Sequence, residues 1–100
     1  MTAPAHLSPA TRAWFEAIAD DYELESTDLR LLELAGVAWD RAVAAREALK
    51  AADGGVLTRD RYGALKAHPA VAIERDAIVA FARLVRELGL RGDQTPNGDL

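Results

Sequence analysis

The chain has 100 residues, of which half are hydrophobic and 6% are aromatic, and its formal net charge is −4. This length supports one small domain with a modest core, and the abundance of alanine over aromatic residues favours closely packed helices over a sheet. The lack of cysteine excludes disulfides, thiolate metal sites and cysteine nucleophiles. No apolar run is long enough to span a membrane, so we expect a cytosolic protein with no membrane partner.

The charge is distributed unevenly along the chain. Residues 14–40 contain eight acidic residues and one basic residue, whereas residues 41–91 contain ten basic and six acidic residues. An assembly of several copies can place the two signs on different surfaces.

The first segments are a predicted disordered N-terminus and a short helix. Residues 1–6 show no periodicity, and chain termini are commonly mobile. Ser8 and Pro9 are typical of an N-cap and a first helical position. We expect order to begin at Leu7, with Trp14 and Phe15 on the apolar face of the short helix.

After an acidic connector at residues 23–25, Ser26 or Thr27 is expected to cap the second helix. This helix is predicted to be the longest, from about Asp28 to Ala52, with its end at residues 53–55. Gly36 in its middle costs roughly 1 kcal/mol relative to alanine, so we expect a close backbone contact there. Small residues form a stripe along which another helix can lie close, and Trp39 borders that stripe. The expected oligomer interface comprises Trp39, Leu31, Ala35, Ala38 and Ala42.

The remaining elements are a connector and a third helix. Residues 56–67 resemble a turn flanked by extended residues, which predicts a small hairpin. Pro69 suits the first position of a helix, and Gly89 suits its left-handed closure. Between them, Val71, Ile78 and other apolar residues predict one apolar face.

These elements predict an all-α fold with a single domain over residues 7–90. The two long helices are expected to pack as an antiparallel pair joined by a turn or small hairpin, with the short helix laid across one end. Residues 91–100 show no apolar stripe and many helix breakers, so they are predicted to be a disordered tail.

Four short motifs, in order, resemble the small subunit of tailed-phage terminases in its short helical family. The motifs are Leu7-Ser8-Pro9, the glycine-containing connector with Gly54-Gly55 and Tyr62-Gly63, His68-Pro69-Ala70, and Glu87-Leu88-Gly89-Leu90. The sequence Ile73-Glu74-Arg75-Asp76 also resembles that family.

The resemblance implies a non-catalytic subunit that forms a homo-oligomeric ring. It implies double-stranded viral DNA and the large terminase subunit, which carries the ATPase and nuclease, as partners. It also implies action in the bacterial host cytoplasm.

Basic residues of the connector are the first candidates for DNA contact. Arg59, Arg61 and Lys66 cluster there and are suited to binding phosphates without reading sequence. The alternative is a solvated turn in which Asp60 pairs with a basic neighbour. Arg46 and Lys50 share a helix face and are further candidates, although such residues are often only the solvated side of a helix.

No catalytic, metal or cofactor site is predicted. The chain has no nucleophile paired with a base and no glycine-rich phosphate loop. His68 lacks a carboxylate at ligand spacing, so we interpret it as a capping residue.

Two further functions remain open at the level of sequence. One is a bacterial helical-hairpin module that binds proteins without binding DNA. The other is a transcription regulator whose residues 8–52 form a helix-turn-helix variant, which the acidity of that region disfavours.

Overall fold

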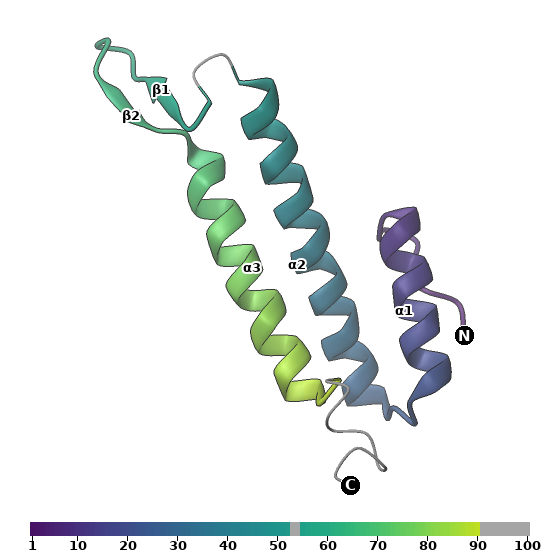
Figure 1. The fold of residues 1–100 in the computed structure, drawn as a ribbon. Helices are drawn as coiled ribbons and strands as arrows, with labels where there is room; N and C mark the ends of the chain where they lie inside the picture. Colours follow the sequence, from purple (N-terminus) through teal and green to yellow (C-terminus); the bar gives the residue numbers. More distant parts are fainter. Residues whose placement is uncertain (53–54, 91–100) are drawn as a thin grey trace, which may run out of the picture.

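The computed structural model describes residues 1–52 and 55–90. The elements are α1 (Pro9–Asp21), α2 (Ser26–Ala51), β1 (Leu57–Arg59), β2 (Leu65–Ala67) and α3 (Pro69–Leu88) (Figure 1). The predicted order of three helices, with a small hairpin between the two long ones, is confirmed. The predicted tail, residues 91–100, lies outside the described residues.

The two long helices form an antiparallel pair, as predicted, and the molecule is elongated, with extents of 57 × 31 × 20 Å. Alanines are buried along both helices, and their small side chains allow the helix axes to approach closely. The buried alanines are Ala35, Ala38, Ala42 and Ala45 on α2, and Ala70 and Ala77 on α3. The small-residue stripe of α2 therefore packs inside the single chain.

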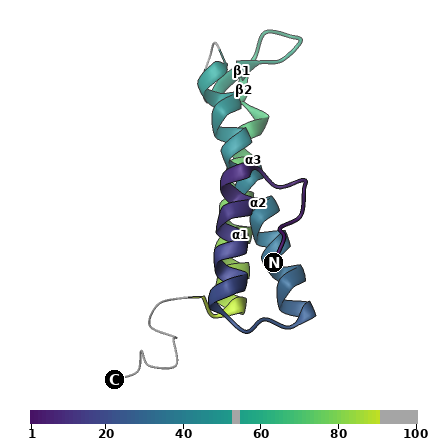
Figure 2. The ribbon, with the colours of Figure 1, turned by 90° about the vertical axis from the view of Figure 1, so that its right-hand side faces the viewer.

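Helix α1 lies beside α2 instead of across one end. Figures 1 and 2 show it running along the half of α2 that is distant from the hairpin. A cluster of buried apolar side chains joins them, comprising Ala3, Leu7, Phe15 and Leu32. A Cβ atom on Gly36 would lie 3.0 Å from Cγ2 of Thr11 and 3.2 Å from both δ-carbons of Leu7. The close contact expected at Gly36 is therefore present, and its partners are Leu7 and Thr11.

Residues 1–6, expected to be disordered, pack against α1 and α2. Ala3 is 6% exposed, and its amide donates a hydrogen bond to Oε2 of Glu16 at 3.0 Å. The amino group of Met1 lies 3.5 Å from Oδ1 of Asp20, and Nε2 of His6 lies 3.3 Å from Oε2 of Glu33. Order in this segment depends on contacts with residues far along the chain, which a test for local periodicity does not detect.

Local capping interactions fix most helix ends. The Ser8 side chain accepts a hydrogen bond from the amide of Thr11, and Nδ1 of His68 accepts one from the amide of Ala70 at 3.0 Å. Gly89 has φ of 67°, and the amide of Leu90 donates to the carbonyl of Val85 at 3.4 Å. These contacts confirm the capping role of His68 and the left-handed closure of α3.

The hairpin projects from the end of the α2–α3 pair (Figure 1). Its strands are antiparallel, with Leu57 opposite Ala67, Thr58 opposite Lys66 and Arg59 opposite Leu65. In the described part of the chain, no helix has both the length and the apolarity needed to cross a bilayer.

Candidate nucleic-acid interface

The tip of the hairpin is held by hydrogen bonds centred on Asp60. Oδ1 of Asp60 accepts hydrogen bonds from the amides of Tyr62 at 2.8 Å and Ala64 at 3.0 Å. The amide of Gly63, whose φ is 83°, donates to the Asp60 carbonyl at 3.0 Å. The Asp60 carboxylate therefore caps the turn, and no ion pair to it is found among residues 1–52 and 55–90.

The structure places Arg59, Arg61 and Lys66 together on this hairpin. Nη1 of Arg59 donates to the Gly63 carbonyl at 2.6 Å, and the guanidinium of Arg61 lies 5.1 Å from the centroid of the Tyr62 ring. Arg59 and Lys66 belong to adjacent cross-strand pairs, so they point to opposite faces of the ribbon. Within the described residues, none of the three cations forms an ion pair with a carboxylate.

The two cations predicted on α2 are both paired with acidic residues. Nε of Arg46 lies 2.7 Å from Oε2 of Glu74 on α3, and Nζ of Lys50 lies 3.7 Å from Oε1 of Glu47 one turn earlier. Both side chains are more than half exposed, but their charges are already partly compensated. The hairpin is therefore the stronger candidate for binding a polyanion.

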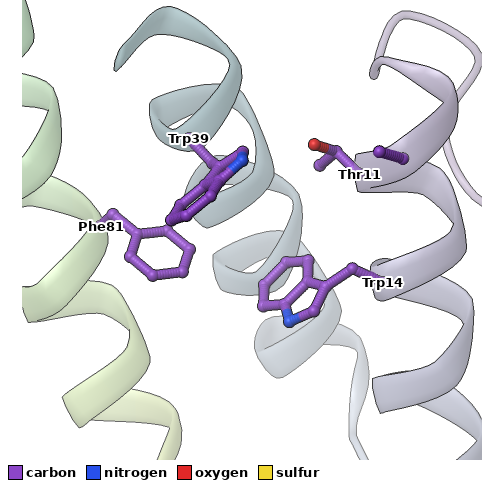
Figure 3. Close-up of a pocket in the computed structure, with 5 residues that line it drawn as sticks. Thr11, Trp14, Trp39 and Phe81 are labelled. Carbon is purple, nitrogen blue, oxygen red and sulfur yellow. The ribbon is translucent and has the colours of Figure 1, made fainter. Parts of the chain in front are cut away.

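An aromatic cluster lies between the three helices, on the flank of the α2–α3 pair. The ring centroids of Trp39 and Phe81 are 5.1 Å apart, and those of Trp14 and Phe81 are 5.9 Å apart. Figure 3 shows Trp14 reaching from α1 toward Trp39 and Phe81, with Thr11 nearby. These residues and Ala10 line a cavity of about 190 Å³.

The flank stays open beyond the N-terminal end of α1, on the side toward the hairpin. A smaller hollow there is lined by Trp39, Ala42, Val43, Arg46, Ile78 and Phe81. Trp39 is 50% exposed, Val43 46% and Ile78 47%. Ile78 was predicted to belong to the packed apolar face, and it is exposed because α1 covers only the other half of the pair. We call Trp39, Val43 and Ile78 the open flank.

The predicted interface residues fall into two groups. Ala35, Ala38 and Ala42 are buried within the single chain, and Leu31 is half-buried. Trp39 alone among them is exposed enough to offer a large apolar surface to another molecule. The role of all five between subunits stays a prediction.

A polar network that the sequence did not reveal joins the start of α1 to α2. Asp40 accepts hydrogen bonds from the Ser8 amide at 2.8 Å, the Ser8 hydroxyl at 2.8 Å and the Thr11 hydroxyl at 2.7 Å. Burial by itself raises the pKa of the Asp40 carboxyl, but these hydrogen bonds and nearby His6 together lower that pKa below its ordinary value of 3.8. Asp40 therefore stays ionised and anchors α1.

No group of three or more His, Asp or Glu side chains able to hold a metal ion is found in the described part of the chain. In the predicted acidic connector, Glu25 serves a local structural role. Glu25 is the N-cap of α2, and its amide donates to Oδ2 of Asp28 at 3.2 Å in a capping box. The expected caps, Ser26 and Thr27, lie one or two residues later than the observed one.

These features define a class: a small, mainly helical protein that presents a cationic hairpin at one end and an open aromatic flank along its side. The family model described as phage terminase, small subunit, matches residues 10–95, and the chain belongs to that family. The small terminase subunit is generally the non-catalytic one. No curated protein and no solved structure matches the chain.

Proposed function

We propose that this protein engages viral DNA as a homo-oligomer and regulates the large terminase subunit, the ATPase and nuclease, during genome packaging in the bacterial host cytoplasm. The family supports a role in packaging. The observation that carries the DNA-binding part is the hairpin, whose three cations have no carboxylate partner among the described residues, whereas the two candidate cations of α2, Arg46 and Lys50, are paired.

The hairpin cations are suited to phosphate contact without sequence reading. Arg61 and Lys66 are exposed at the tip and on a strand, at the end of an elongated molecule. One hairpin provides few phosphate contacts and binds weakly on its own. Several hairpins held in one assembly bind the same DNA with a high effective concentration, which raises the overall affinity.

The open flank supports self-assembly. Large exposed apolar side chains that lie together on a surface commonly mark a protein interface, and tryptophan is enriched where binding energy is concentrated. Trp39 sits beside two further half-exposed apolar residues, Val43 and Ile78. We propose that a neighbouring copy covers this flank.

Salt-dependent DNA binding tests the role of the hairpin. Binding of the full chain to a labelled duplex is measured by fluorescence anisotropy over a range of salt concentrations. Each phosphate contact removed is expected to reduce the slope of log K against log salt by about one, so Arg61→Ala and Lys66→Ala each flatten it. Arg75→Ala is the matched control, because Arg75 is an exposed arginine on α3 paired with Asp76. Absence of duplex binding at low salt would refute DNA engagement.

The assembly is tested by native mass spectrometry and light scattering. The wild-type chain is expected to form a closed oligomer. Trp39→Ser is expected to lower the mass of the assembly while the variant keeps its helical circular dichroism. Leu34→Ser is the control, since Leu34 is also exposed on α2, at 54%, but points away from Trp39. A single copy at micromolar concentration contradicts the assembly.

The alternative function, a helical-hairpin module that binds other proteins without DNA, rests on the same open flank. The two functions are separated by the hairpin variants. If the protein is a DNA-packaging subunit, removing charge from the hairpin weakens DNA binding. If it is a protein-binding module, the wild type itself does not bind DNA.

A further inference from the structure

We propose that Tyr62 is a base-stacking residue that gives the protein a preference for DNA with unpaired or loosely stacked bases over a closed duplex. This inference rests on the proposed DNA engagement by the hairpin. The cations of the hairpin are suited only to phosphates. Tyr62 adds a contact to bases, and with it a preference for one class of DNA.

The first observation is the exposure of Tyr62. Its side chain is 81% exposed, more than any other large hydrophobic residue in the described part of the chain. The turn it occupies is a position where glycine, asparagine, aspartate and serine are common. An aromatic ring in solvent at such a position contributes little to the fold, so a role in binding accounts for it better.

The second observation is that hydrogen bonds within the turn hold Tyr62 in place without a ligand. The Asp60 carboxylate accepts hydrogen bonds from the amides of Tyr62 and Ala64. The Asp60 carbonyl accepts one from the Gly63 amide, and the Asp60 amide donates one to the Ala64 carbonyl. Arg59 closes the other side through the Gly63 carbonyl. A pre-ordered loop loses less conformational entropy on binding than a flexible one.

The third observation is the placement of Arg61 over the Tyr62 ring, 5.1 Å from its centroid. A cation over one face of an aromatic ring leaves the other face available for a flat partner. A nucleobase is such a partner, and every base can stack, so the contact does not require a particular sequence. Lys66 on the same hairpin is placed for the adjoining phosphates.

The preference for opened DNA follows from where bases are accessible. In a closed duplex both faces of each base are already stacked, and inserting a side chain between two base pairs requires partial unstacking. A frayed end, a nick or a single-stranded extension exposes a base without that requirement. Stacking on Tyr62 is therefore expected to favour those forms.

The test compares the full-length protein and two variants on two DNAs by fluorescence anisotropy. The DNAs are a blunt duplex and the same duplex with a single-stranded extension. Tyr62→Phe keeps the ring, and Tyr62→Leu keeps apolar bulk without a ring; circular dichroism verifies that both are folded. The wild type and Tyr62→Phe are expected to prefer the extended DNA. Tyr62→Leu is expected to lose on the order of tenfold in affinity for it, with an unchanged salt slope.

A 2-aminopurine base in the extension provides a direct readout, because its fluorescence is quenched on stacking. Quenching by the wild type and not by Tyr62→Leu supports the inference. Equal wild-type affinity for both DNAs overturns it, and so does a Tyr62→Phe variant as weak as Tyr62→Leu. In either case salt-dependent duplex binding leaves the proposed function standing. If the wild type binds neither DNA, both proposals fail.

Discussion

Replacing Asp40 by alanine is expected to detach the start of α1 from α2. The carboxylate accepts hydrogen bonds from the Ser8 amide, the Ser8 hydroxyl and the Thr11 hydroxyl, at 2.7 to 2.8 Å. A hydrogen bond to a charged group contributes about 1.5–3 kcal/mol, and leaving a buried donor unpaired costs about 1–3 kcal/mol. Thr11 is 3% exposed, so its hydroxyl loses its partner without gaining full access to water. Because Asp40 itself is only half-buried, we expect a total loss of roughly 2–4 kcal/mol in the free energy of unfolding.

The assay is urea denaturation at a fixed protein concentration, followed by tryptophan fluorescence, which reports on Trp14 and Trp39. Asp76→Ala is the matched control, since the Asp76 side chain is 74% exposed and pairs with its neighbour Arg75. This variant is expected to change stability by less than about 0.5 kcal/mol. If Asp40→Ala is as mild as the control, the network does not anchor α1.

Acidification provides an independent measurement of the same anchor. Hydrogen bonds hold the pKa of Asp40 below its ordinary value of 3.8. A carboxyl whose pKa is lower in the folded state stabilises the fold above its unfolded pKa, and that contribution disappears as the pH falls through the folded pKa. The stability difference between wild type and Asp40→Asn is therefore expected to be constant near neutral pH and to shrink below about pH 4. If the stability difference between wild type and Asp40→Asn instead grows as the pH falls, the lowered pKa of Asp40 is not its cause.

Three further substitutions test local features by the same denaturation assay. Gly36→Ala is expected to lower the free energy of unfolding by about 1 kcal/mol, because the added Cβ would press on Thr11 and Leu7. The same change in an exposed helix raises stability by about 1 kcal/mol. A stabilised variant would therefore show that Thr11 and Leu7 move aside. Gly89→Ala is expected to lower the free energy of unfolding by about 1 kcal/mol, because Gly89 has φ of 67°. Gly89→Asn is expected to lower it less, since asparagine adopts the left-handed conformation more readily than alanine. Equal losses for the two variants would refute the left-handed cap. Arg46→Gln is expected to change stability by less than about 1 kcal/mol, since its ion pair is exposed, and a larger loss would reveal a structural role.

The helix boundaries were predictable because their signals are local. His68 and Pro69 begin α3, and Gly89 ends it, through contacts within a few residues of each position. Ser8 begins α1 for the same reason. The cap of α2 was misplaced because Ser26 and Thr27 are statistically better caps than Glu25, but Glu25 and Asp28 form a capping box that begins the helix one residue earlier.

The features that could not be predicted depend on pairs distant in sequence. Ala3 is buried because Glu16 and Leu32 lie beside it, and Asp40 is a hydrogen-bond acceptor because the turn between α1 and α2 returns Ser8 to its side. Neither pairing has a periodic signature. Small-residue periodicity located the stripe on α2, but periodicity does not distinguish packing within a chain from packing between chains.

The candidate site was predictable in composition and not in detail. Arg61 and Lys66 were found as a charge cluster on a connector, and the connector is a hairpin. Whether those charges were compensated required coordinates, because Asp60 is adjacent in sequence and yet serves the backbone of the turn. The open flank required coordinates as well, since the exposure of Ile78 follows from where α1 begins along α2.

The positions of the two surfaces restrict how copies can assemble if both are functional. The open flank runs along the side of an elongated molecule, whereas the hairpin projects from one end. A twofold pair of antiparallel copies would send its two hairpins to opposite ends. A ring in which the long axis of each copy runs along the rotation axis keeps all copies pointing the same way, which places every hairpin on one rim. The acidic stretch of residues 14–40 lies along α1 and the part of α2 distant from the hairpin, so the same symmetry collects those carboxylates toward the other rim. DNA approaching such a ring would be attracted at the hairpin rim and repelled at the opposite one.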